Sequence, residues 1–417
     1  MSGPGATPTD PAKQRVPRPV ILVGWVSFFA DVSSEMAYPL LPLFLVGTLG
    51  APATALGVVE GAAVGAVALL AVFSGKRSDR SGRRLPWVRL GYGLPVLGKS
   101  LVAAATAWPA VLAGRLIDRV GKGLRSGPRD ALIADSVPRE MLGRAFGLHR
   151  AMDTAGALTG VVLSAGLLWA LGRWHAGSAE KDGDGHLRIA LAVSAVLALV
   201  SLGVTFLLKE PARASGPPKP ESKPLAGAGG LPAPYWRTIA VLTVFAAANS
   251  SDAFLLLRAG QVGLSAWEVV AAYALFNLTY TVVSYPAGVL ADRIGRWRVI
   301  GIGWAVYILV YSGFAMLDHA RWGAAWMVWP LMATYGVYMG LTDGVGKALV
   351  AQVAPAERRG TAMGVFVMTT GLASVGGSVA AGAVWDLKSP AAAMWLGAGL
   401  AAAALALIPL AARRSRR

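Results

Sequence analysis

The stretch Arg129-Asp-Ala-Leu-Ile-Ala-Asp-Ser-Val-Pro-Arg-Glu-Met-Leu-Gly-Arg-Ala-Phe-Gly147 recurs 217 positions later as Gly346-Lys-Ala-Leu-Val-Ala-Gln-Val-Ala-Pro-Ala-Glu-Arg-Arg-Gly-Thr-Ala-Met-Gly364. The same offset aligns Ser33-Ser34-Glu35 with Ser250-Ser251-Asp252. Similarity at one fixed spacing is the mark of a duplicated unit. We therefore expect one fold that is built from two related halves.

The composition indicates that the surroundings of these halves are a lipid bilayer. Hydrophobic residues make up 55% of the chain, charged residues 15%, and the mean hydropathy is +0.54, which exceeds what a soluble domain buries. Residues 189–208 are apolar almost throughout, whereas a membrane barrel would show alternation. We predict an all-α membrane protein with twelve transmembrane helices, near 19–47, 55–75, 87–107, 109–134, 143–170, 187–208, 236–258, 266–288, 298–317, 323–350, 359–384 and 390–412.

The distribution of Lys and Arg predicts the orientation. They gather in the connections on the side of the amino terminus, which places both termini in the cytoplasm of a multi-pass protein of the cell (inner) membrane. The net charge of +17 then faces anionic lipid headgroups, and nucleic acid is not an expected partner. The predicted parts are a cytoplasmic tail at 1–18, helix bundles at 19–208 and 236–412, a linker at 209–235 and a basic tail at 413–417.

A short motif occurs once in each half. Gly75, Asp79, Arg80, Gly82 and Arg83 follow the second predicted helix, and their counterparts after the eighth are Gly288, Asp292, Arg293, Gly295 and Arg296. These segments resemble the signature loop of the major facilitator superfamily. The resemblance implies two six-helix bundles that rock around a central site, with these loops as conformational gates.

The fourth predicted helix carries a second resemblance to that superfamily. Gly114-Arg115 and the spaced glycines up to Gly123 are similar to a motif whose Arg is associated with proton coupling. Residues at helical spacing form a charged stripe along this helix. Charges near the bilayer centre are costly, so the stripe is expected to face the central cavity or other helices. Its members are Arg115, Asp118, Lys122, Arg125 and Arg129.

Further ionisable groups lie on the first and fifth predicted helices. Asp31, Glu35 and Tyr38 share one face of the first helix, and Pro39 and Pro42 should loosen it. A carboxyl that alternates between a desolvated and an ion-paired environment takes up and releases a proton. The fifth helix adds His149 and Asp153, followed by the glycine pair at 156 and 160, which has the spacing of an efflux signature without its proline.

We divide the candidates into two groups. The proton-coupling group comprises Asp31, Glu35, His149, Asp153 and Arg115. The substrate-cavity group comprises Tyr38, Asp118, Arg119, Lys122, Arg125, Asn249, Asp252, Asp343 and Lys347. Other acids of the membrane region, Glu60 among them, receive no assigned role.

We expect neither a cofactor nor a metal site. The polar loop from Glu180 to His186 lacks the downstream Glu of a calcium loop and is interpreted as a solvated loop. With no cysteine in the chain, thiol chemistry is excluded. We find no nucleophile or phosphate-binding motif, so an enzyme is not expected.

The sequence thus predicts a monomeric secondary transporter of a small solute. Its leading form is proton-coupled efflux of a drug or metabolite. Two alternatives stay open, namely proton-coupled uptake or exchange of an organic anion bound by the basic stripe, and a membrane receptor or scaffold without transport.

Overall fold

The computed structural model describes residues 17–81, 83–138, 141–174, 183–210, 231–319, 324–355 and 359–412. Within these ranges the chain is all-α. Its elements are α1 (Arg18–Ala37), η2 (Tyr38–Leu40), η3 (Leu43–Thr48), α2 (Ala53–Ser81), α3 (Leu85–Ala103), α4 (Trp108–Asp135), α5 (Leu142–Trp174), α6 (Gly183–Thr205), α7 (Ala233–Ala248), α8 (Ala253–Gln261), α9 (Ala266–Ile294), α10 (Arg296–Ala315), η5 (Met316–His319), η6 (Ala324–Met327), α11 (Val328–Val353), α12 (Arg359–Leu387) and α13 (Pro390–Ala412).

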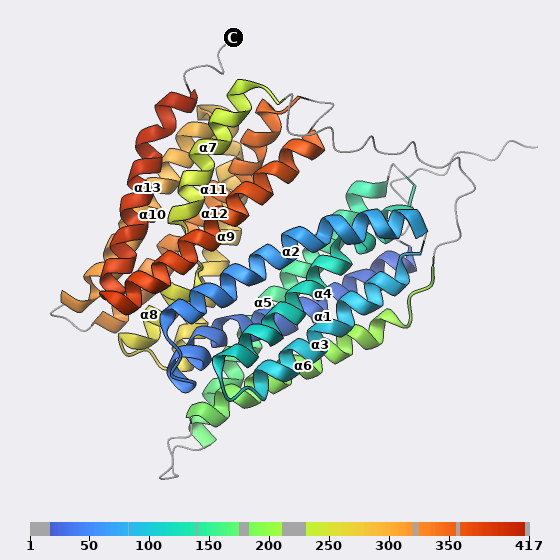
Figure 1. The fold of residues 1–417 in the computed structure, drawn as a ribbon. Helices are drawn as coiled ribbons and strands as arrows, with labels where there is room; N and C mark the ends of the chain where they lie inside the picture. The colour runs from blue at the N-terminus through green and yellow to red at the C-terminus, as the bar shows by residue number, and fades with distance from the viewer. Residues whose placement is uncertain are drawn as a thin grey trace, which may run out of the picture.

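The described helices form two bundles (Figure 1). Helices α1–α6 pack on one another, α7–α13 do likewise, and the contacts between the bundles are chiefly those of α2 with α12 and of α5 with α9. Eight helical spans among the described residues are long and apolar enough to cross a bilayer. Large apolar side chains such as Leu97 and Leu309 are each 64% exposed, as expected for surfaces that lipid covers. The count of twelve spans stays a prediction.

The two bundles meet at one end and diverge at the other (Figure 1). We call the end where they meet the α8 end, and the end where α13 finishes the C-terminal end. Along α2, a Cβ at Gly57 would strike the backbone of Ser378 in α12, whereas Gly65, two turns closer to the C-terminal end, has open space around it. The halves are therefore packed backbone to backbone at the α8 end.

The duplicated Ser-Ser-acid segments have different backbones in the two halves. In the first half the segment is helical within α1, and the helix is irregular only beyond it, as a 3-10 turn at Tyr38–Leu40 and a π-helix at Leu43–Thr48. In the second half the helix breaks between α7 and α8, where Asn249 has ψ 79°. Asn, Ser and Asp side chains compete with helical hydrogen bonds, and the Ser251 hydroxyl accepts from the Ala253 amide.

Two glycines allow α5 to contact α1 at backbone distance. A Cβ at Gly156 would collide with the Phe28 backbone, and one at Gly160 with the Val32 backbone. We expect Gly156→Val to destabilise the bundle by about 1–3 kcal/mol through overpacking, measured as a lower apparent Tm of the protein in detergent. Gly166→Val on the same helix, where the Cβ meets open space, is the control, and an equal loss in both variants would contradict the interpretation.

Candidate functional site

A cavity of about 510 Å³ lies between the two bundles. Both halves line it, the first through α1, α2 and α4, and the second through the 249–252 break, α9, α11 and α12. Its lining residues include Ser34, Glu35, Tyr38, Glu60, Val64, Val67, Arg115, Arg119, Lys122, Asn249, Ser250, Ser251, Asp252, Tyr273, Met339, Val367, Ser374 and Ser378. A cavity with ionisable lining residues at the junction of related halves is typical of the solute site of secondary transporters.

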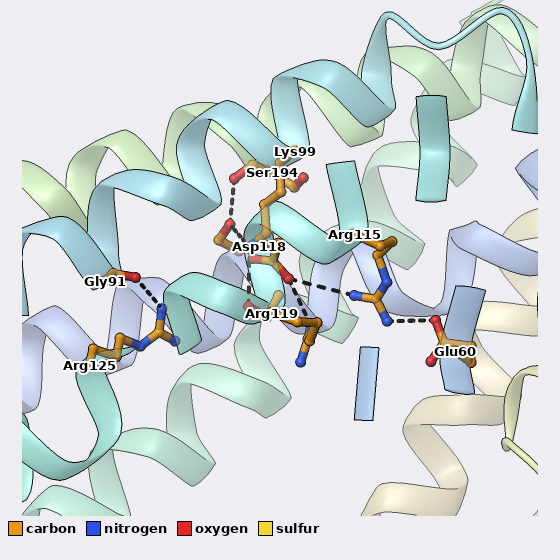
Figure 2. Close-up of polar contacts among 10 residues, drawn as sticks. Glu60, Gly91, Lys99, Arg115, Asp118, Arg119, Arg125 and Ser194 are labelled. Atoms are coloured by element: carbon orange, nitrogen blue, oxygen red, sulfur yellow. Dashed lines mark hydrogen bonds and ion pairs between the residues drawn. The ribbon is translucent and has the colours of Figure 1, made fainter. Parts of the chain in front are cut away.

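The charged stripe of α4 faces other helices and the cavity, as its helical spacing predicts. Most of its side chains form ion pairs. Arg115 Nη2 donates to Glu60 Oε1 of α2 at 2.6 Å, and Arg115 Nη1 lies 3.7 Å from Asp118 Oδ2. Arg119 Nη2 lies 3.0 Å from the same Asp118 oxygen. Figure 2 shows Arg115 between the two acids. The side chains of this pair, Arg115 and Glu60, are 7% and 8% exposed.

Three ionisable groups in the cavity lining lack an ion-pair partner of opposite charge within 4.0 Å among the described residues. These are Lys122, Glu35 and Asp252. Glu35 Oε2 accepts a hydrogen bond from the hydroxyl of Tyr273, 3.1 Å away on α9. Asp252 Oδ1 accepts one from the hydroxyl of Tyr335, 2.6 Å away on α11. Charges without ionic partners in a cavity are available to a solute or a proton.

The duplicated segments both contribute to this cavity. Ser34 and Glu35 line it from α1, and their counterparts Ser251 and Asp252 line it from the break between α7 and α8. Buried Lys99 holds the first segment, because its Nζ donates to the Ser33 and Ser34 hydroxyls at 2.5 and 3.1 Å. The second is held by Ser378 of α12, whose hydroxyl accepts from the Ser251 amide at 3.0 Å.

Four residues expected at the cavity are not among its lining residues. Asp118 lies behind Arg115 and Arg119 and serves as their counter-ion. Arg125 is buried, with its guanidinium 4.3 Å from the Tyr92 ring centroid. Asp343 and Lys347 of α11 pair with each other at 2.8 Å, and both are partly exposed. Helical spacing places a residue on a face, but the neighbouring helices decide whether that face reaches the cavity.

The proton-coupling candidates divide in the same way. Glu35 and Arg115 line the cavity, whereas Asp31, His149 and Asp153 are not among its lining residues. His149 Nε2 is 2.8 Å from the Ser27 hydroxyl and 3.7 Å from Asp153 Oδ1. The structure thus joins α1 and α5 through His149 in the interior of the first bundle.

The gate segments do not form the loops that the sequence suggested. Helix α2 continues to Ser81, so Gly75, Asp79 and Arg80 belong to its last turns; Gly82 is outside the described residues, and Arg83 follows it in the link to α3. Helix α9 likewise includes Gly288, Asp292 and Arg293. Among the gate residues that the structure describes, Gly295 has a positive φ of 98°, a conformation that favours glycine. Arg296 pairs with Asp292 at 3.3 Å.

Sequence reasoning missed Glu60, Tyr273 and Tyr335 as site residues. Glu60 was visible as an acid inside a predicted span, which is a functional signal by itself. The two tyrosines gave no signal, because aromatic residues in a spanning helix are ordinary.

A carboxylate connects the two halves at the α8 end. Asp386, near the end of α12, accepts from the Ala53 and Thr54 amides at 2.8 and 2.7 Å, and from the Thr54 hydroxyl at 2.5 Å. These amides open α2 and have no partner within that helix. Asp386 therefore caps a helix of the opposite half, and this cap must break if the α8 end is to open.

We expect Asp386→Ala to increase the population that is open at the α8 end about fivefold, since the loss of a cap at a helix N-terminus costs about 1 kcal/mol. Spin labels at Ala107→Cys and Met316→Cys, in a chain without native cysteine, report the distance between the halves by pulsed electron resonance. Lys388→Ala, an exposed neighbour, is the control. A distance distribution that Asp386→Ala leaves unchanged would contradict this role.

Comparisons with known proteins agree with this architecture. Residues 23–378 match the family model described as Major Facilitator Superfamily. The chain is similar to an uncharacterized MFS-type transporter of Methanocaldococcus jannaschii, with 32% identity over 378 residues, 88% of this chain and 89% of the relative. It is also similar to the multidrug resistance protein MdtH of Cronobacter sakazakii, with 30% identity over 133 residues, 32% of this chain and 33% of the relative. The solved structure of a variant of the nucleoside transporter NupG superposes with a TM-score of 0.79 at 14% identity, covering 95% of this chain and 100% of that one.

Proposed function

The chain belongs to the major facilitator superfamily, and on this premise we propose that it is a secondary transporter that couples efflux of a small polar solute to protons. The observation that carries the proposal is the cavity between the halves, which ionisable side chains of both halves line. Because both bundles line this site, a movement of one bundle against the other changes the site. Solute binding and the conformation of the protein are therefore linked.

The cavity fits a small solute with a polar part. Its volume of about 510 Å³ falls within the range of small-molecule sites, about 300–1,000 Å³. The polar groups Glu60, Arg115 and Ser378 lie toward the α8 end of their helices. Val67 on α2 and Val367 on α12 line the cavity further toward the C-terminal end. A solute with a polar head and a less polar body suits this arrangement.

Two observations support the direction and the coupling ion. The partial similarity to a multidrug resistance protein favours efflux over uptake. The Glu35 carboxyl of the first half accepts its hydrogen bond from Tyr273 of the second half, so rocking would change its surroundings and its proton affinity.

The test is proton movement in liposomes that contain the purified protein and a pH-sensitive dye. A panel of organic cations, zwitterions, neutral solutes and organic anions is added outside. We expect a change of internal pH that depends on one solute class and is absent from protein-free liposomes. If solute moves down its gradient while the pH stays constant, transport is retained as the function and proton coupling is rejected.

The second candidate function is proton-coupled uptake or exchange of an organic anion, and Lys122 favours it. This side chain lines the cavity without an ionic partner among the described residues. If an anion is the substrate, Lys122→Met should weaken its binding about tenfold, the loss expected for a contact of about 1.4 kcal/mol. Equal affinity of the wild type and the variant for every anion of the panel would remove this candidate.

We further propose that the C-terminal end faces the cytoplasm. Arg84, Lys209 and Arg298 lie in or next to the helix ends at this side of the molecule, and basic residues near helix ends favour the cytoplasmic side. The protein then faces inward in the described conformation. Protease or label access to either terminus in oriented membranes tests the assignment.

A further inference from the structure

The central cavity contains two acids, Glu35 and Asp252, that form no ion pair with a basic side chain of the described residues. Glu60 is paired with Arg115, and Asp118 with Arg119. Glu35 and Asp252 accept hydrogen bonds from tyrosine hydroxyls, and no Lys, Arg or His nitrogen of the described residues lies within 4.0 Å of either carboxylate. Desolvated carboxylates are stable only with a counter-charge or a proton, so this pair of acids is suited to a positively charged solute.

The two acids are equivalent members of the duplication. Glu35 and Asp252 are 217 positions apart, the offset that relates the halves, and each follows two serines. One is held by α1 of the first bundle, the other by the α7–α8 break of the second. A ligand that contacts both acids therefore bridges the two moving bodies of the transporter.

Aromatic rings connect the two acids. The rings of Tyr38 and Tyr273 lie 5.6 Å apart between centroids. Tyr273 donates to Glu35, and the Tyr38 hydroxyl is 3.5 Å from the hydroxyl of Ser251, the neighbour of Asp252. These residues all line the same cavity. Aromatic faces combined with carboxylates are the chemistry that recognises ammonium groups.

The basic residues of the cavity are less available to an anion. Arg115 already pairs with Glu60 at 2.6 Å and Arg119 with Asp118 at 3.0 Å, and a carboxylate ligand would have to compete with these contacts. Lys122 alone is without an ionic partner among the residues that the structure describes. Its ammonium group can donate to the carboxylate of a zwitterion, but a single Lys does not form an anion clamp.

We propose that the transported solute carries an ammonium group, which binds between Glu35 and Asp252 against the rings of Tyr38 and Tyr273. This inference rests on the proposed transport function and names the chemical class of its substrate. In this proposal Asp252 contacts the solute directly. Glu35 and Asp252, which are equivalent positions of the duplication, both bind the same ammonium group.

The experiment measures binding to the purified protein by calorimetry, with solutes matched in skeleton. One set is tyramine, its neutral counterpart 4-ethylphenol, the zwitterion tyrosine and the carboxylate 4-hydroxyphenylacetate; further sets use aliphatic and quaternary amines. We expect at least one amine or zwitterion to bind tenfold or more tightly than its neutral and carboxylate counterparts. Glu35→Gln and Asp252→Asn should each remove that preference.

Asp343→Asn is the matched control, because this acid is already paired with Lys347 and does not line the cavity. It should leave amine binding unchanged. If only carboxylates bind, if no amine binds, or if amine binding survives both Glu35→Gln and Asp252→Asn in folded protein, the ammonium site is overturned. If amines bind as expected but no solute moves protons in liposomes, the ammonium site stands and the proton-coupled function falls.

Discussion

Glu35→Gln is expected to reduce proton movement driven by the solute to the level of protein-free liposomes. The reason is the position of this carboxyl at the junction of the bundles. Its hydrogen-bond donor, the Tyr273 hydroxyl, belongs to the other half and is 3.1 Å away. If rocking of the halves separates the carboxyl from this partner, as we propose, the change of environment would bind and release a proton.

The structure distinguishes Glu35 from the other acids near it. Asp252 accepts from Tyr335 within its own half, so rocking changes that contact less. Asp31, one turn before Glu35 on α1, is not among the lining residues of the cavity. We therefore expect Asp31→Asn to keep measurable proton movement, although the sequence alone gives both acids the same role.

The measurement uses the pH-sensitive dye inside liposomes and the solute that gives the largest wild-type signal. Solute counterflow, in which no proton gradient is needed, is recorded in parallel. A variant that exchanges solute without moving protons has lost coupling. We expect this outcome for Glu35→Gln at a solute concentration raised at least tenfold, which offsets the weaker solute binding expected of this variant. Wild-type proton movement in both Glu35→Gln and Asp31→Asn would remove both acids from the mechanism.

Glu60→Gln is expected to destabilise the folded protein by about 3–5 kcal/mol, because breaking a buried ion pair leaves its partner uncompensated. The Arg115 side chain is only 7% exposed, and its contact with Glu60 Oε1 measures 2.6 Å. Asp118 remains as a second counter-ion, but it lies 3.7 Å away and is shared with Arg119. We expect the apparent Tm in detergent to fall by roughly 3–6 °C.

Two further variants separate charge from packing. In the double variant Glu60→Gln with Arg115→Met, the unpaired charge is gone, and most of the lost stability should return. Asp343→Asn breaks an ion pair whose side chains are 38% and 55% exposed, and we expect a cost below about 1 kcal/mol. A double variant less stable than Glu60→Gln alone would show that the pair does not act through charge compensation.

The duplicated sequence and the hydropathy by themselves determined the architecture. In a bilayer the backbone N–H and C=O groups find no water, so apolar segments of this length satisfy their hydrogen bonds internally by forming helices. Helical spacing also determined that the α4 stripe turns away from lipid, because charges at that depth are too costly on the outer face. Of the residues predicted from sequence to line a substrate cavity, Tyr38, Arg119, Lys122, Asn249 and Asp252 do line it, and so does Glu35, which was predicted for proton coupling.

Only the tertiary structure decided which groups meet. Periodicity fixes the residues that share one face of one helix, but it carries no information on the rotation and neighbours of other helices. The Glu60–Arg115 pair, the Tyr273–Glu35 hydrogen bond and the Asp386 cap on α2 each join residues at least 55 positions apart. The break at 249–252 has a local and a tertiary part. Asn249, where the helix breaks, corresponds to Val32 of the helical first copy, and Ser378 of α12 holds the broken segment through the Ser251 amide. The two copies of the segment therefore differ in structure both because their sequences differ at this position and because different helices pack against them.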